Sequence, residues 1–356
     1  MITICTAAER PDLWKISNDA PAFWPGYNMH GDVVGQWWGL LDEELPQFQF
    51  VLYDDEAGSV AARGLTGPLA WNGQDEAPPD GIDQVIEQIF TQHRSHAAVS
   101  ALCALAAEIS PDARGRGLAA EVLASMRNVA QRNGLRHLIA PVRPSWKHRY
   151  PLTPIKNYVR WRRPDGQLLD PWMRTHERLG ARVATPLPRS LRITGTVADW
   201  ESWTDLAFPE SGDYVFPEGL TTVHIDRAAD RGTYWEPNVW LIHPNIETRH
   251  CSPPSRPQVR PAHIDSALDV QESAMFDPWI RVHTRLGGRL GPVLPRSLRI
   301  TASVADWESW TRMRFPETGD YVFPAGLAPV HIDRDQDTGR YWEPNVWLIH
   351  RSRGPG

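Results

Sequence analysis

The stretch "EISPDARGRGLAAEVL" (residues 108–123) decides the fold, because an apolar run, a glycine-containing turn and an amphipathic segment meet in it. The run before it, "AVSALCALAAEIS" (98–110), has the length and apolar character of a buried strand. The segment after it, "GLAAEVLASMRNVAQRNG" (117–134), ends at a glycine and repeats apolar residues at helical spacing: Leu118, Val122, Leu123, Met126 and Val129. The pattern predicts a strand, a tight turn and a helix.

The turn itself, Arg114-Gly115-Arg116-Gly117, lies where the predicted strand ends and the helix begins. The first turn of a helix has free N–H groups and the positive end of the helix dipole, which together bind anions. The two glycines allow backbone amides to approach a phosphate closely, and the two arginines add positive charge. We interpret the turn as a pyrophosphate cradle. It is not a Walker A loop, because no Lys-Ser/Thr follows the glycine, and it is too short for the dinucleotide-binding fingerprint.

Strands and helices alternate on both sides of this turn. "FQFVLYD" (48–54) and "GLTGPLAWNG" (64–73) are typical of strands joined by residues 55–62, and "HLIAPVRP" (137–144) predicts another strand. Residues 80–94 carry Ile82, Val85, Ile86 and Ile89 at helical spacing. The order strand, turn, helix, strand is a βαβ unit. The predicted fold class is therefore α/β or α+β.

The C-terminal part of the chain contains an internal repeat. Residues 171–243 align without a gap to residues 278–350, and roughly seven positions in ten are identical, a self-similarity that has to be interpreted before a fold is assigned. Both copies end in "YWEPNVWLIH". Two copies are too few for a solenoid. The region between them, 244–277, begins with a segment rich in Pro, Ser and Arg and is interpreted as a linker, with a short helix predicted near 265–271.

Composition excludes several classes of protein. The chain has 356 residues, a formal net charge of −6, an apolar fraction of 41% and a charged fraction of 22%, which are typical of a globular protein. The net charge gives no general attraction to nucleic acid or to an anionic membrane. The cysteines Cys5, Cys103 and Cys251 have neither disulfide nor metal-ligand spacing, so no metal site is predicted. No signal peptide or membrane-spanning run stands out, so we expect a cytoplasmic protein.

The strand-turn-helix segment resembles the acyl-CoA motif of the GNAT N-acetyltransferases, Arg-x-x-Gly-x-Gly/Ala, with Arg114, Gly117 and Ala119 at its three defined places. The resemblance implies a mostly antiparallel mixed sheet flanked by helices, and acetyl-CoA or another acyl-CoA as co-substrate. It also implies that backbone amides of the turn hold the CoA pyrophosphate and that backbone near Ile109 pairs with pantetheine. The implied cofactor-binding residues are Ile109, Arg114, Gly115, Arg116, Gly117, Leu118 and Ala119.

The resemblance also suggests catalytic residues. "HERLGAR" (176–182) is similar to the Tyr-x-x-x-Gly-Phe pattern of the family, with His176 in place of the tyrosine that protonates the leaving thiolate and Ala181 in place of the aromatic residue. His176 could donate that proton as imidazolium, or it could only pack on its helix. Glu108 is the carboxylate nearest the strand and is the candidate general base, or it could be a surface or capping acid. A base acting through water, such as His30 or Glu87, is a further alternative.

Aromatic residues are concentrated in two regions. Residues 20–48 include Trp24, Tyr27, Met29, His30, Trp37 and Trp38, with Asp32 and Glu43 or Glu44 as nearby acids. They would suit a partly apolar amine, although most are expected in the core. The repeat carries Trp200, Trp203, Trp235 and Trp240, which are expected in the core or, as the alternative, on a sugar-stacking surface. The basic segment "RPSWKHRY" (143–150) could meet the 3′-phosphate of CoA or an acidic substrate, or form a solvated loop.

The sequence thus predicts a GNAT-like domain over residues 1–243, a linker over 244–277, and a partial duplicate over 278–356 that contains His283 but no second glycine turn. The predicted function is transfer of an acetyl or other short acyl group to a small-molecule amine. Two alternatives are a degenerate acyl-CoA-binding sensor or assembly protein, and a carbohydrate-binding module. A half-domain would expose a sheet edge and an apolar face, so we expect it to pack on the first domain or to mediate a homodimer.

Overall fold

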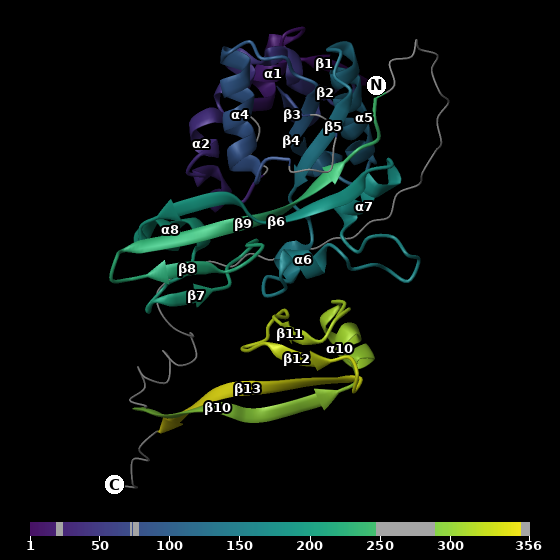
Figure 1. Cartoon of the computed structure of the whole chain (residues 1–356). Helices are drawn as coiled ribbons and strands as arrows, with labels where there is room; N and C mark the ends of the chain where they lie inside the picture. Colours follow the sequence, from purple (N-terminus) through teal and green to yellow (C-terminus); the bar gives the residue numbers. More distant parts are fainter. Residues whose placement is uncertain (19–23, 72, 74–77, 247–288, 350–356) are drawn as a thin grey trace.

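The structure is a computed structural model that describes residues 1–18, 24–71, 73, 78–246 and 289–349. Within these residues the chain forms a nine-stranded sheet flanked by helices and a separate four-stranded sheet (Figure 1). In the larger sheet the order is β1-β2-β3-β4-β5-β9-β8-β7, and β6 also pairs with β9. β4 and β5 run parallel, and the other pairs described are antiparallel. The predicted α/β fold class with a mostly antiparallel sheet is confirmed.

The elements of the N-terminal half follow the apolar periodicity of the sequence. Its strands are β1 (Ile2–Thr6), β2 (Phe50–Asp54), β3 (Ser59–Leu69), β4 (Ala101–Ile109) and β5 (His137–Val142). Its helices are α1 (Pro11–Asn18), η1 (Gly26–His30), α2 (Val34–Trp37), α3 (Leu40–Glu44), η2 (Pro46–Phe48), α4 (Ile82–Arg94), η3 (Pro111–Ala113) and α5 (Leu118–Arg132). α4 packs on β3 and β6, and α5 packs on β3, β4 and β5. Strand β3 begins earlier than predicted, at Ser59, because Ser59, Val60 and Ala62 pair with β2 instead of forming a loop.

β4 and β5 separate in the middle of the sheet. They pair in parallel only from Ala101–Cys103 with His137–Ile139, after which β5 pairs with β9 and β4 continues beside β3. A register shift against β3 inserts Leu105 as an extra residue in β4, and such bulges often re-aim side chains next to active sites. This fork leaves the facing edges of the two strands without each other as partners. It creates the space in which the candidate site lies.

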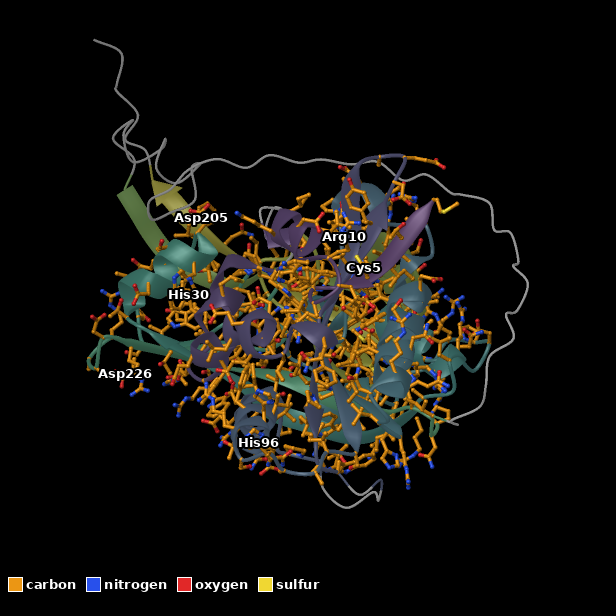
Figure 2. All side chains as sticks on the ribbon, turned by 90° about the horizontal axis from the view of Figure 1, so that it is seen from above. Cys5, Arg10, His30, His96, Asp205 and Asp226 are labelled. Atoms are coloured by element: carbon orange, nitrogen blue, oxygen red, sulfur yellow. The ribbon has the colours of Figure 1, made fainter. Side chains whose placement is uncertain are left out.

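The second half of the larger sheet is built from long strands. After η4 (Lys147–Arg149), α6 (Ile155–Tyr158) and α7 (Pro171–Arg178) come β6 (Arg182–Gly195), α8 (Val197–Thr204), β7 (Gly212–Tyr214), β8 (Val223–Asp226) and β9 (Arg231–Ile242). A second core forms under α8, where Tyr27 of η1 packs against Trp200, Phe216 and Tyr234. His30, labelled in Figure 2, stacks on Trp203 with ring centroids 4.2 Å apart. Trp200 and Trp240 are fully buried, which agrees with the expected core role and excludes a sugar-stacking surface at these two rings.

The four-stranded sheet consists of β10 (Arg289–Ala302), β11 (Gly319–Tyr321), β12 (Val330–Asp333) and β13 (Thr338–Ile349), with α10 (Val304–Thr311) beside it. Its order β10-β13-β12-β11 repeats the order β6-β9-β8-β7. It contacts the first part of the chain near α6, where Tyr150 Oη accepts a hydrogen bond from the Arg314 amide (3.0 Å) and its ring lies 6.2 Å from that of Tyr321. Figure 1 shows this sheet beneath α6.

The two copies differ in what covers them. Leu191 is 4% exposed and its counterpart Leu298 is 48% exposed, while Trp240 is buried and its counterpart Trp347 is 59% exposed. In the described part of the chain, no strand lies beside β13 as β5 lies beside β9. The predicted linker beyond Ile246, the helix expected at 265–271, Cys251 and His283 lie outside the described residues.

Candidate functional site

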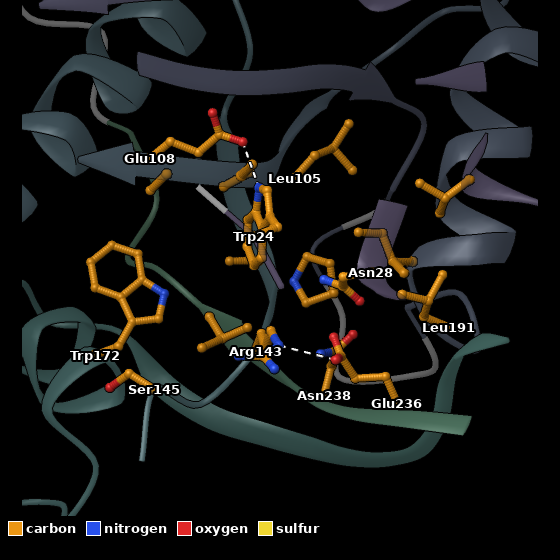
Figure 3. A pocket seen from close by; sticks show the side chains of 18 of the residues that line it. Trp24, Asn28, Leu105, Glu108, Arg143, Ser145, Trp172, Leu191, Glu236 and Asn238 are labelled. Atoms are coloured by element: carbon orange, nitrogen blue, oxygen red, sulfur yellow. Dashed lines mark hydrogen bonds and ion pairs between the residues drawn. The ribbon is translucent and has the colours of Figure 1, made fainter. Parts of the chain in front are cut away.

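A cavity of about 520 Å³ lies at the fork between β4 and β5 (Figure 3). β4 contributes residues 104–109, beginning directly after its last pairing with β5, and β5 and its exit contribute residues 140–143. The remaining walls come from η1 and α2 on one side and from α5, α7 and β9 on the other. Because backbone groups of β4 face the cavity without strand partners there, an extended ligand could pair with them as an added strand would.

The glycine turn lies at one end of this cavity. Gly115 and Gly117 have φ of +78° and +80°, and a Cβ on either would meet no protein atom within 4 Å. Gly117 is the N-cap of α5, and no side chain caps the helix. The exposed Arg114 lines the cavity, whereas Arg116 donates to Asp54 (2.7 Å). The turn is therefore open, left-handed at both glycines and positively charged, as a diphosphate site requires.

The other predicted cofactor-binding residues surround the turn. Ile109 ends β4 and lines the cavity. Leu118 and Ala119 form the first turn of α5, and the Leu118 side chain is buried, which leaves only its amide for a ligand. The structure thus brings all seven predicted residues together, with Arg116 engaged by Asp54.

Glu108 lies on the wall of the same cavity and is buried. Its Oε1 accepts a hydrogen bond from Trp24 Nε1 (2.6 Å), and its Oε2 forms an ion pair with Arg63 (Figure 3 shows the Trp24 contact). Glu108 is therefore not the surface or helix-capping acid that the sequence also allowed. Both of its oxygens already have a partner.

His176 is held in the cavity wall by the local structure of α7. Asp170 caps this helix by accepting hydrogen bonds from the amides of Trp172 (3.0 Å) and Met173 (3.1 Å), and Pro171 follows it at a position that favours helix starts. The Trp172 ring packs edge-on against His176 with centroids 4.4 Å apart. His176 Nδ1 lies 2.9 Å from Nε2 of His243, the residue after β9.

Burial controls the charge of this histidine. His176 is 1% exposed, and burial, with a smaller contribution from His243, lowers its pKa well below the ordinary value. At neutral pH the side chain is therefore neutral. The imidazolium expected from the sequence is not its resting form.

The opposite end of the cavity carries buried polar groups that the sequence analysis did not identify. Arg143 Nε donates to Glu236 Oε2 (3.0 Å), and Arg143 Nη2 donates to Tyr27 Oη (3.0 Å). Asn28 and Asn238 also line this end, and Asn28 Oδ1 is buried without a partner in the described part of the chain. Figure 3 shows Arg143 and Glu236 across the cavity from Glu108. The motif "WEPNVW" (235–240) indicates Glu236 and Asn238, because polar residues two apart in an apolar strand lie on one buried face.

The basic segment 143–150 is mostly packed into the protein, although Arg149 is exposed. Arg143 is paired with Glu236, and Lys147 is fully buried, with Nζ donating to the carbonyl oxygens of Tyr150 (2.7 Å) and Leu220 (2.6 Å). Burial lowers the pKa of Lys147 to about 7. Most of this segment is therefore not the solvated loop that the sequence also allowed. Its contact with a phosphate or an acidic substrate stays a prediction, and Arg143 lines the cavity.

The predicted acceptor residues of the N-terminal region divide into two groups. Trp24, Met29 and Trp38 line the cavity, while Tyr27 lies in the core under α8 and Trp37 stacks on Phe90. The predicted acids do not line the cavity: Asp32 binds Arg192, Glu44 binds Arg94, and Glu43 is absent from the cavity walls. The candidate alternative bases His30 and Glu87 do not line it either. The acids at the site are Glu108 and Glu236.

Two general properties follow from the described residues. None of their helices is both long and apolar enough for a membrane span. They also contain no cluster of three or more His, Cys, Asp or Glu side chains arranged to hold a metal ion.

Comparison with known proteins finds a relative in sequence and solved structures of low similarity. No protein-family model matches the chain. The arginine N-acetyltransferase avaD of Aspergillus versicolor is 30% identical over 272 residues, which covers 67% of this chain and 92% of the relative. Among solved structures, the loading GNATL domain of CurA from Lyngbya majuscula has a TM-score of 0.44 and 16% identity, covering 70% of this chain and all of that chain. The GphF GNAT-like decarboxylase in complex with isobutyryl-CoA has a TM-score of 0.42 and 16% identity over 68% of this chain and 98% of that chain. At these levels neither structure informs on activity.

Proposed function

Because the chain belongs to the GNAT superfamily of N-acetyltransferases, which use acetyl-CoA as acyl donor, we propose that its acceptor is a small molecule carrying an arginine-like amine or amino acid group. The observation that carries this proposal is that one cavity joins the glycine turn to the buried polar groups Arg143, Glu236 and Asn28. The first end fits a diphosphate. The second end offers a cation, a carboxylate and an unpartnered amide oxygen to a polar acceptor. The name of the relative supports arginine as the first acceptor to test.

Different residues along the cavity would bind different parts of the two substrates. The amides of Leu118 and Ala119, together with Arg114, would hold the CoA diphosphate, and the unpaired edge of β4 would hold the pantetheine arm. Bound acetyl-CoA supplies a thioester whose acyl carbon the acceptor amine can attack. Trp24 and Trp38 exclude water and provide apolar contact for the acceptor.

Proton transfer is assigned to His176 rather than Glu108. Both Glu108 oxygens are engaged, by Trp24 and Arg63, so we propose that this carboxylate holds Trp24 in the cavity wall and is not the general base. His176 is neutral, lines the cavity, and has one ring nitrogen without a partner in the described residues. A neutral imidazole can take a proton from an attacking amine and return it to a leaving thiolate.

The test is release of free thiol from acetyl-CoA in the presence of arginine, agmatine and a panel of simple alkylamines. We expect the wild-type chain to turn over arginine or a close derivative. Glu236→Gln should raise the KM for that acceptor and leave the KM for acetyl-CoA unchanged. Thermal stabilisation by acetyl-CoA without thiol release for any amine would instead support the acyl-CoA-binding sensor. That alternative is not favoured, because the enzyme relative aligns over 92% of its length.

We further propose that residues 1–243 form the catalytic domain, that 244–277 connect it to the partial duplicate 278–356, and that the duplicate pairs two copies of the chain. The exposed apolar residues Leu298 and Trp347 of the second sheet and Trp310 of α10 support this proposal. Light scattering of the full chain should then give a dimer that Leu298→Lys weakens without loss of kcat. A monomeric wild-type chain at micromolar concentration would contradict it. A cytoplasmic location also remains a proposal.

A further inference from the structure

Two buried histidines face each other at the side of the cavity. His176 Nδ1 and His243 Nε2 are 2.9 Å apart, and the two residues are 1% and 2% exposed. The His243 amide donates to Leu138 O (3.0 Å), which fixes this residue to β5 as well as to β9. The outer nitrogens, His176 Nε2 and His243 Nδ1, are buried and have no hydrogen-bond partner in the described part of the chain. The pair therefore carries two unsatisfied ring nitrogens that packing alone does not require.

A contact between two imidazole nitrogens holds one proton, so it determines the tautomers of both rings. If His176 Nδ1 carries the proton, His243 Nε2 accepts it and His176 Nε2 keeps a lone pair. The opposite tautomer would place a hydrogen on His176 Nε2 and leave it unable to act as a base. His243 contacts only Nδ1 of His176. Through that contact it determines whether Nε2 of His176 carries a hydrogen or a lone pair.

We propose that His243 is a positioning residue for acetyl transfer: its Nε2 accepts the Nδ1–H of His176 and thereby keeps the lone pair of His176 on Nε2 for the reacting amine. This inference rests on the proposed function. As the C–N bond forms, the amine N–H bond breaks and an N–H bond forms at His176 Nε2. As the C–S bond breaks, that proton passes to the thiolate sulfur. The pair returns to its neutral state, and no other reactant is consumed.

The electrostatic surroundings fit a pair that is neutral at rest and charged only briefly. Burial lowers the pKa of His243 to about 4, with a smaller contribution from Arg127 of α5, and burial likewise lowers the pKa of His176. His243 acts electrostatically on His176, and Arg127 acts on His243. Trp172 packs against His176 and limits rotation of its ring. When His176 Nε2 accepts a proton, the charge is stabilised through the Nδ1–H contact with His243, as in other oriented histidine bases.

The counterparts in the internal repeat do not bear on this pair. His283 and His350 lie outside the described residues, and the second copy has no glycine turn before it.

The test compares His243→Phe, which cannot accept the hydrogen bond, with His243→Gln, whose amide oxygen can reach the position of Nε2. We expect kcat to fall about 10- to 100-fold in His243→Phe, as for other residues that orient a functional histidine, with KM for acetyl-CoA unchanged and a substantial part of kcat recovered in His243→Gln. The matched control is His137→Gln, because His137 also hydrogen-bonds a side chain, Asn245 (3.0 Å), but does not line the cavity. That control should keep wild-type kcat.

The second readout does not depend on turnover. Nitrogen-15 NMR of histidine-labelled protein at pH 7 should show His176 with a protonated Nδ1 and an unprotonated Nε2, and His243→Phe should redistribute the tautomers. The proposal is overturned if His176 carries its proton on Nε2, or if His243→Phe keeps kcat within twofold. It is also overturned if the Gln and Phe variants lose kcat equally while remaining folded. If the wild-type chain acetylates no amine, the proposed function fails, and the NMR result still decides the orientation of the pair.

Discussion

Replacing Gly117 by alanine separates the conformational role of the glycine turn from its role in binding. Gly117 has φ of +80°, and the space that its Cβ would enter is free of protein atoms within 4 Å. Alanine therefore meets no steric clash in the folded chain, but it has to adopt a left-handed conformation. Gly134, which follows the C-terminal end of α5, offers a matched control, since it has φ of +69° and is equally open.

The magnitude follows from these two facts. A left-handed alanine costs about 1–2 kcal/mol, so Gly117→Ala and Gly134→Ala should lose similar stability, equivalent to a fall in Tm of about 2–4 °C per kcal/mol. Only at residue 117 does the new methyl group stand where a diphosphate would approach the helix amides. Loss of one charge-assisted hydrogen bond there weakens binding by about 1.5–3 kcal/mol, which corresponds to a roughly 10- to 100-fold higher KM for acetyl-CoA.

The assay measures Tm and the KM for acetyl-CoA in both variants at a saturating concentration of acceptor. We expect equal losses of stability and an increase in KM in Gly117→Ala alone. If the two variants have the same KM as the wild-type chain, the turn is only a structural corner and the diphosphate lies elsewhere. If KM rises equally in both, the effect comes from general destabilisation of α5.

Three further outcomes are expected. Arg114→Ala should raise the KM for acetyl-CoA about 3- to 10-fold at low salt, and less at high salt. Arg116→Ala should change this KM less, because the Arg116 cation already binds Asp54. Equal effects of the two variants would contradict the role of Arg114 in binding the diphosphate. The pKa of His243 in the folded chain, about 4, lies below its ordinary value of 6.5. Between these two pH values the unfolded chain therefore binds more protons than the folded chain. The free energy of unfolding should fall by up to about 1.4 kcal/mol per pH unit as the pH drops from 6.5 toward 4. Chemical denaturation of wild-type protein and His243→Gln over this range should show a shallower dependence in the variant. Glu236→Gln leaves the Arg143 cation without its buried counter-ion and should cost about 3–5 kcal/mol, which denaturant titration measures.

The elements around the glycine turn could be predicted because local patterns determine them. The apolar run of β4, the two glycines and the helical periodicity of α5 are each specified by neighbouring residues, and the structure has them at nearly the predicted bounds. The helix that carries His176 is expected from the family resemblance, and the structure shows Asp170 and Pro171 at its start. Within this segment, the turn and the helix agree with the sequence because their interactions span only a few residues, whereas β4 was recognisable from its apolar run although it pairs with the distant strand β3.

The acceptor end could not be predicted in the same way, because its interactions connect residues far apart in the chain. Arg143 and Glu236 are separated by 93 positions, and His176 and His243 by 67. In the sequence, Arg143 begins a basic run that is typical of an exposed loop, while His243 ends an apolar strand with no sign of a partner. The pairing of β5 with β9 brings Arg143 and Glu236 to the same cavity.

The charged groups Arg143 and Glu236 are buried at the acceptor end, and their energetics suggest why. An ion pair such as Arg143–Glu236 contributes little net stability, since the cost of removing both charges from water can equal or exceed their attraction. Apolar side chains of similar volume would close this end of the cavity at least as stably. A polar acceptor, however, has to lose its own hydration on entering, and fixed buried charges replace that hydration without reorganising. The pair is therefore better explained as a preorganised site for a polar acceptor than as a stabilising element, which agrees with an acceptor of the amino acid class.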